Sequence, residues 1–103
     1  YVEDAAEAIV QTLEKYEDNE TPLNVGTGSD ISIKDLVTYI VDALQYEGGV
    51  EWNTEKPDGQ MKKLLDTSRM QEILDINPID VKEGIKQTIS WYIENKEKAD
   101  ARK

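Results

Sequence analysis

Apolar side chains recur at helical spacing in the first half of the chain. Across residues 3–16, Ile9, Leu13 and Tyr16 occupy positions i, i+4 and i+7, which predicts an amphipathic helix. A second helix is predicted from Ser32 to about residue 46, because Ser32 and Asp35 have the spacing of a capping box. We expect this second helix to bury its apolar residues, which are Leu36, Val37, Ile40, Val41 and Leu44.

The second half of the chain predicts two more helices. A short one covers residues 67–74 and ends before Asn77 and Pro78, since proline restricts the residue that precedes it. A longer one begins after Asp80, with Glu83 at the capping-box position three residues on. Its apolar stripe consists of Val81, Ile85, Ile89 and Tyr92.

Residues 22–26 and 50–54 read as short strands, and residues 61–66 read as a third extended segment or as the lead-in to a helix. The sequence therefore predicts an α/β fragment, α+β-like in composition, with four helices and two or three short strands. A strand, helix, strand connection would make neighbouring strands parallel. So few strands form a poor sheet alone, and we expect a subdomain over residues 1–95 that leans on a partner, followed by a charged tail at 96–103.

Composition narrows the possible functions. The chain has 103 residues and a net charge of -10, which disfavours contact with nucleic acid or an anionic membrane. It contains no Cys and no His, so thiolate or imidazole metal sites and a Ser-His-Asp triad cannot be built from it. No apolar run approaches the length of a membrane span, and the expected compartment is the cytoplasm.

One stretch departs from the acidic character of the chain. Residues 55–70, called the basic segment below, contain three acidic residues and four basic ones, Lys56, Lys62, Lys63 and Arg69. Pro57, Asp58 and Gly59 predict a tight turn, after which a lysine could meet a phosphate as a compact point charge. Charge and spacing alone favour a solvated turn over a ligand site.

Two other motifs carry less weight. Gly26 and Gly28 lie between a predicted strand and a predicted helix, but Ile31 stands where a dinucleotide loop has its third glycine. A structural turn is therefore the favoured interpretation. Tyr92 and Lys96 have Tyr-x-x-x-Lys spacing, but Tyr92 belongs to the predicted buried stripe of the last helix, which argues against a catalytic role.

Four stretches in order, YVEDAAEAIV, LNVGTGSDISIKDLV, KPDGQMKKLLDTSRM and VKEGIKQTISWYIEN, resemble the C-terminal part of extended short-chain dehydrogenases that act on nucleotide-sugars. Within this family the chain looks most like GDP-L-fucose synthases, which convert GDP-4-keto-6-deoxy-mannose to GDP-L-fucose with NADPH. The third stretch is the most specific of the four. The resemblance covers essentially the whole chain.

The resemblance implies a division of labour. The family's N-terminal Rossmann domain carries the NADP loop and the catalytic residues, and we expect the present chain to be a piece that lacks that half, binds no cofactor and is inactive alone. Two family substrate contacts map onto Asp58 and Lys63. Lys62 stands where the family often has Arg, and Met61 replaces a Pro. We expect Lys63 to contact the pyrophosphate and Asp58 a polar group of the nucleotide or sugar.

Other interpretations stay open at this point. The chain could be a stand-alone interaction or oligomerisation module that keeps the fold without the chemistry, or could form a homodimer through a docking face. A UDP-sugar or dTDP-sugar epimerase or dehydratase is a third possibility, because no set of residues here reads the nucleotide base.

Overall fold

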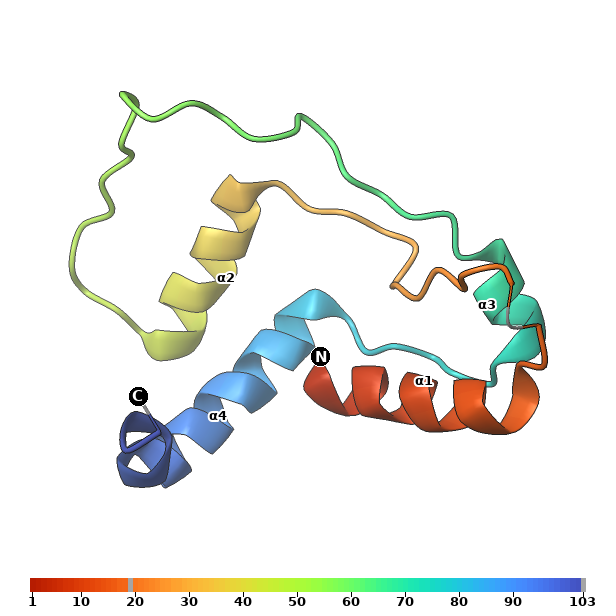
Figure 1. Ribbon diagram of the computed structural model, residues 1–103. Coiled ribbons are helices and arrows are strands. Elements are labelled where there is room, and N and C mark those ends of the chain that lie inside the picture. The colour runs from red at the N-terminus through yellow and green to blue at the C-terminus, as the bar shows by residue number, and fades with distance from the viewer. Residues whose placement is uncertain (19, 103) are drawn as a thin grey trace. The chain divides into compact units, whose positions relative to one another are not determined.

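The computed structural model describes residues 1–18 and 20–102, and the described residues contain four helices and no strand. The helices are α1 (Val2–Lys15), α2 (Ile33–Leu44), α3 (Ser68–Ile73) and α4 (Val81–Asp100) (Figure 1). The chain divides into two compact units, each described by itself. One holds α2 and α4 together with Tyr1, and the other holds residues 2–30 and 49–78, with α1 and α3.

The predicted helices are confirmed to within a few residues, but the predicted strands are wrong. Residues 22–26, 50–54 and 61–66 carry no strand among the described residues, and Figure 1 draws the chain between α2 and α3 as one long stretch without regular structure. A strand needs a neighbour to accept and donate its backbone hydrogen bonds. None of these three segments has such a neighbour in the described structure, so their alternating pattern does not become a sheet.

The α2 and α4 unit is built on half-buried apolar side chains. The Ser32 Oγ accepts a hydrogen bond from the Asp35 backbone N–H at 3.0 Å, which confirms the predicted start of α2. Helix α2 packs against α4, yet none of its residues is fully buried, and Ile40 and Leu44 are exposed, contrary to the prediction. The reason is that α2 has one packing partner in this unit, so only part of its wide apolar stripe is covered.

Helix α4 approaches the N-terminus of the chain through a glycine. Gly84 is buried, and a Cβ at this position would lie 3.3 Å from the Tyr1 Cβ. The backbone of Asn95 is non-helical, so α4 is kinked there before it continues to Asp100. The kink falls beside the predicted boundary of the charged tail, and that division stays a prediction.

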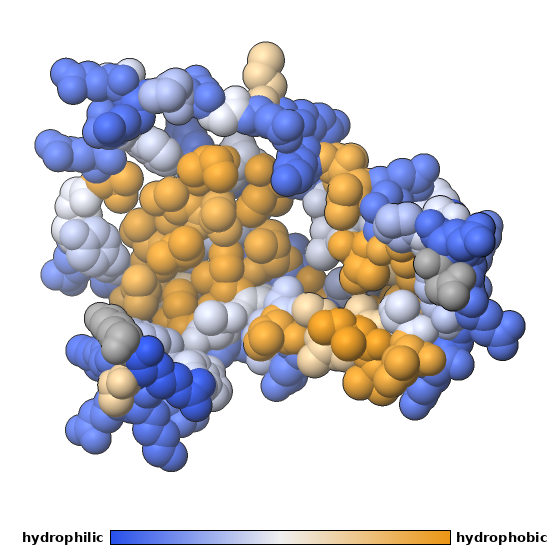
Figure 2. Space-filling view, in the orientation of Figure 1, coloured by the Kyte–Doolittle hydropathy of each residue, from blue (hydrophilic) through white to orange (hydrophobic). Residues whose placement is uncertain are grey.

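The α1 and α3 unit holds the buried core of Ala8, Met70 and Leu74, with Leu23, Ile73 and Ile76 packed around it. The predicted apolar stripe of α1 faces the other way: Ile9 is 72% exposed and Leu13 is 87% exposed. Figure 2 shows the resulting apolar surface along α1. Ala8, next to Ile9 in the sequence, is the residue of α1 that packs with Met70 of α3 and with Leu74.

A glutamine fixes this contact. The Gln11 side chain is 8% exposed; its Nε2 donates to the Asp75 carbonyl oxygen at 3.0 Å, and its Oε1 accepts from the Asp75 backbone N–H at 2.8 Å. This pair of bonds satisfies both backbone groups of the residue that follows the end of α3 by two positions. The side chain therefore joins two segments that are 64 residues apart in sequence.

Candidate functional site

The basic segment runs through solvent before it enters α3. Every residue from 55 to 66 is exposed. The predicted turn at Pro57, Asp58 and Gly59 is wrong, because the chain turns earlier. The Asn53 Oδ1 accepts from the Glu55 backbone N–H at 3.2 Å, and the Asn53 carbonyl oxygen accepts from the Lys56 N–H at 3.4 Å. Residues 57–59 themselves form no hydrogen-bonded turn.

The end of the basic segment lies along the loop that precedes α2. The Asn24 Nδ2 donates to the Asp66 carbonyl oxygen at 3.4 Å. Gly28 has a φ of +77°, and a Cβ there would lie 3.2 Å from the Thr67 Oγ1. Thr67 is itself buried. The glycines of this loop therefore allow close packing against Thr67, which agrees with the structural interpretation of the loop.

The structure treats the three predicted ligand residues differently. The Lys62 Nζ lies 3.9 Å from the Asp30 Oδ2, with side chains 67% and 43% exposed. Within residues 1–18 and 20–102, no ion pair holds Lys63, and Asp58 is likewise exposed and unpaired with any cation. The structure thus brings Lys62 to an acidic loop and presents Lys63 and Asp58 to solvent.

The fourth basic residue of the segment has a structural role that the sequence did not indicate. The Arg69 guanidinium donates to the Tyr16 hydroxyl at 2.8 Å, lies 5.6 Å from the centre of that ring and is 3.8 Å from the Asp18 carboxylate. The Tyr16 hydroxyl also donates to the Thr21 carbonyl oxygen at 2.5 Å. Arg69 therefore links α3 to the end of α1. No spacing rule connects residues 53 positions apart, so sequence reasoning could not find this contact.

Backbone and hydroxyl donors tune two of the nearby carboxylates. The Glu20 backbone N–H donates to the Asp18 carboxylate at 2.9 Å and lowers the pKa of that group, with smaller contributions in the same direction from Thr21 and Arg69. The Ser68 hydroxyl and N–H do the same for Asp66 and lower its pKa. Both aspartates stay ionised near neutral pH, so they add to the negative field around the lysines.

Tyr92 has the wrong electrostatics for a catalytic base. Its hydroxyl donates to the Asp100 Oδ1 at 2.9 Å, and this bond raises the pKa of the phenol because it favours the neutral form. A catalytic Tyr-x-x-x-Lys pair needs the opposite shift. This hydrogen bond argues against a catalytic role, but the predicted place of Tyr92 in the buried stripe of α4 is wrong, because the side chain is 41% exposed.

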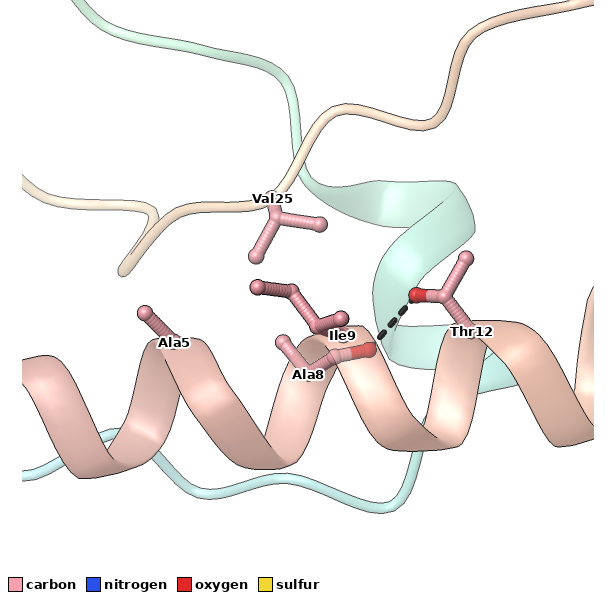
Figure 3. Close-up of a pocket in the computed structure, with 5 residues that line it drawn as sticks. All are labelled: Ala5, Ala8, Ile9, Thr12 and Val25. Carbon is pink, nitrogen blue, oxygen red and sulfur yellow. Dashed lines mark hydrogen bonds between the residues drawn. The ribbon is translucent and has the colours of Figure 1, made fainter.

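Two hollows open on the same unit. One has a volume of about 470 Å³ and is lined by Ala5, Ala8, Ile9, Thr12 and Val25, with Val25 pointing toward the side chains of α1 (Figure 3). The other has a volume of about 520 Å³ and is lined by residues 51–55, which are mostly polar. Asp58, Lys62 and Lys63 line neither hollow.

The described residues offer neither a metal site nor a membrane-spanning helix. The part of the chain that the structure describes contains no group of three acidic side chains placed to share a metal ion. Of the four helices described, none combines the length and apolarity needed to cross a bilayer.

Sequence comparison finds relatives named as synthases of GDP-linked sugars. The chain is 36% identical over 95 residues to the probable GDP-L-fucose synthase 1 of Oryza sativa subsp. japonica, a match that covers 92% of this chain and 29% of the relative. It is 32% identical over 106 residues to the GDP-L-fucose synthase of Escherichia coli (strain K12), covering 95% of this chain and 33% of the relative. It is 30% identical over 96 residues to the GDP-L-colitose synthase of Yersinia pseudotuberculosis, covering 93% and 31%.

Neither of the other comparisons gives a match: no family model and no solved structure matches the chain. The chain spans about a third or less of the length of the curated relatives above. The resemblance inferred from the four motifs is nevertheless confirmed: along nine tenths of its length, this chain is similar to the C-terminal part of GDP-L-fucose synthases, within the extended short-chain dehydrogenases that act on nucleotide-sugars.

Proposed function

We propose that this chain supplies the nucleotide-sugar-binding part of an epimerase and reductase of the GDP-L-fucose synthase type. The observation that carries the proposal is the similarity over 92% of the chain to a relative named for a GDP-linked sugar, at 36% identity. The reaction would convert GDP-4-keto-6-deoxy-mannose to GDP-L-fucose. Chemistry and cofactor binding would belong to a Rossmann domain outside the residues described here.

The role of the chain in that reaction is to bind and orient an anion. A nucleotide-sugar carries about two negative charges on its pyrophosphate, and a chain of net charge -10 repels it unless cations are concentrated locally. Lys63 is exposed and unpaired among the described residues, so its ammonium is available to a phosphate oxygen. Asp58, five residues earlier on the same exposed stretch, can accept from a hydroxyl or amine of the ligand.

NADPH supplies the hydride in such a reaction, and the residues of this chain do not fit it. The space beside Gly28 is taken by Thr67, and the Tyr92 hydroxyl is bonded to Asp100. We therefore assign NADP to the Rossmann domain of the complete enzyme and no cofactor to this chain. Binding of the sugar nucleotide, rather than proton or hydride transfer, is the property to test here.

A second candidate is favoured by the surface of α1. Its exposed apolar side chains, Ile9 and Leu13 among them, offer a face that a protein partner or a second copy of the chain could cover. In that case the chain is an interaction module, and the lysines are solvated. The two candidates predict different responses to a nucleotide-sugar.

Isothermal titration calorimetry of the full-length protein that carries this sequence tests the proposal, with GDP-mannose, UDP-glucose and dTDP-glucose as ligands. We expect GDP-mannose to bind and Lys63→Ala to weaken it about five-fold, as for loss of one exposed charge contact worth about 1 kcal/mol. Lys34→Ala on α2 is the matched control and should leave the affinity unchanged. Binding of UDP-glucose or dTDP-glucose in place of GDP-mannose assigns the base differently, and absence of all binding favours the interaction module.

A further inference from the structure

Asp30 and Lys62 form the one contact that links a predicted ligand residue to another part of the described chain. Their charged atoms are 3.9 Å apart, beyond hydrogen-bond distance. Both side chains remain largely in water. An exposed pair of this kind contributes little to stability and exchanges readily for another partner.

The neighbourhood holds these two groups near each other without help from the ion pair. Asn24 bonds to the Asp66 carbonyl oxygen, and Gly26 and Gly28 pack against Thr67. The loop that carries Asp30 and the segment that carries Lys62 are therefore also joined by contacts between residues 24–28 and residues 65–67. Asp30 does not anchor the basic segment; it neutralises one of its cations.

We infer that Asp30 is the resting counter-ion of Lys62, and that the pyrophosphate of the ligand displaces it. The inference rests on the proposed function, since it concerns the same anion site. On binding, the Lys62 ammonium exchanges one carboxylate at 3.9 Å for a pyrophosphate that carries about two negative charges in all, while Asp30 returns to water. Asp30 thus lowers affinity and makes the site selective for ligands with enough negative charge to compete.

The sign of one substitution distinguishes a counter-ion from an anchor. Asp30→Asn removes the competing charge, so GDP-mannose should bind about three-fold more tightly at low salt, the order expected for one unit charge at an exposed site. An anchoring role predicts weaker binding instead. Glu14→Gln, which removes the same charge from an exposed position on α1, is the matched control and should change the affinity little.

Two further measurements show whether Asp30→Asn changes the affinity through charge or through the structure: one varies the charge of the ligand, and the other varies the salt concentration. Guanosine has no phosphate, so its affinity should be the same in the wild type and in Asp30→Asn. The gain for GDP-mannose should disappear at about 1 M salt, where the screening length falls to about 3 Å. An equal gain for guanosine, or a gain that persists at high salt, would overturn the inference.

The effect of Asp30→Asn is also measured in a Lys62→Gln variant. Asp30→Asn should have little effect once the Lys62 ammonium is absent, which gives a coupling between the two substitutions. Inorganic pyrophosphate tests the exchange independently of the base, and Asp30→Asn should tighten its binding as well. If wild-type protein binds GDP-mannose through Lys63 but Asp30→Asn binds it equally or more weakly, the inference fails and the proposed function stands. If neither GDP-mannose nor pyrophosphate binds, both fail.

Discussion

Two regions of the same unit differ in how they are held: the contact between α1 and α3, and the exposed part of the basic segment at residues 55–66. Gln11 makes two hydrogen bonds to the backbone of Asp75, and Arg69 joins the Tyr16 ring and the Asp18 carboxylate. Among the described residues, only one lysine of the basic segment has an ion pair: Lys62, whose Nζ lies 3.9 Å from the Asp30 carboxylate. One region is fixed by satisfied polar groups over a small core, while the other exposes its charges. Stability and ligand binding should therefore respond to different substitutions.

The largest expected effect is in the core. Leu74→Ala should lower the free energy of unfolding by about 2 to 3 kcal/mol, because it removes a side chain that is 5% exposed and leaves a cavity. Urea unfolding followed by circular dichroism measures it. Leu13→Ala makes the same chemical change at a side chain that is 87% exposed and should cost less than about 0.5 kcal/mol. Equal losses would mean that the α1 surface is covered in the protein.

The second largest effect on stability is expected at Gln11, whose side chain bonds to the Asp75 backbone. Gln11→Leu keeps a side chain of similar size but leaves the Asp75 N–H and carbonyl without their partner, which should cost about 1 to 3 kcal/mol in urea unfolding. Gln71→Leu, at an exposed position of α3, is the control and should be nearly neutral. A Gln11→Leu protein as stable as the wild type would show that the two hydrogen bonds contribute nothing net.

A substitution in the basic segment should lower the affinity for the ligand and leave the stability of the fold unchanged. Lys63→Ala should leave the urea midpoint unchanged, since no ion pair in the described residues holds that side chain, while it weakens GDP-mannose binding about five-fold. Calorimetry measures the affinity for GDP-mannose and urea unfolding measures the stability, both on the same sample. A loss of stability without a loss of affinity would place Lys63 in the fold and not in the site.

The smallest expected effect is on the stability of the fold at acidic pH. Hydrogen bonds lower the folded-state pKa of Asp18 and Asp66 below the ordinary value of 3.8, so their ionised forms stabilise the folded state above that value. This stability is lost as the pH falls from about 3.8 through the folded pKa. Asp18→Asn should therefore flatten the acid side of the stability profile, measured by thermal unfolding between pH 5 and pH 2. A profile of unchanged slope would show that Asp18 makes no pH-dependent contribution.

The sequence predicted what depends on local chemistry. Both helix starts lie where expected: the start after Ser32 has the predicted capping bond, whereas Asp80 makes no side-chain capping bond and that start follows from the apolar spacing alone. The strands and the buried face of α1 depend on neighbours far along the chain: no spacing rule indicates that Ala8, and not Leu13, meets Met70 and Leu74. In the site, the sequence pointed to Lys62 and Lys63, but Asp30, the partner of Lys62, comes from a loop that only folding brings near.

Hydrogen–deuterium exchange with mass spectrometry on the full-length protein, with and without saturating GDP-mannose, shows whether the basic segment binds the nucleotide-sugar. We expect slower exchange in peptides that cover residues 56–66 and the loop at 24–30, and no change in the α2 and α4 peptides. Protection confined to α2 and α4, or no protection anywhere despite measured binding of the ligand, would contradict it.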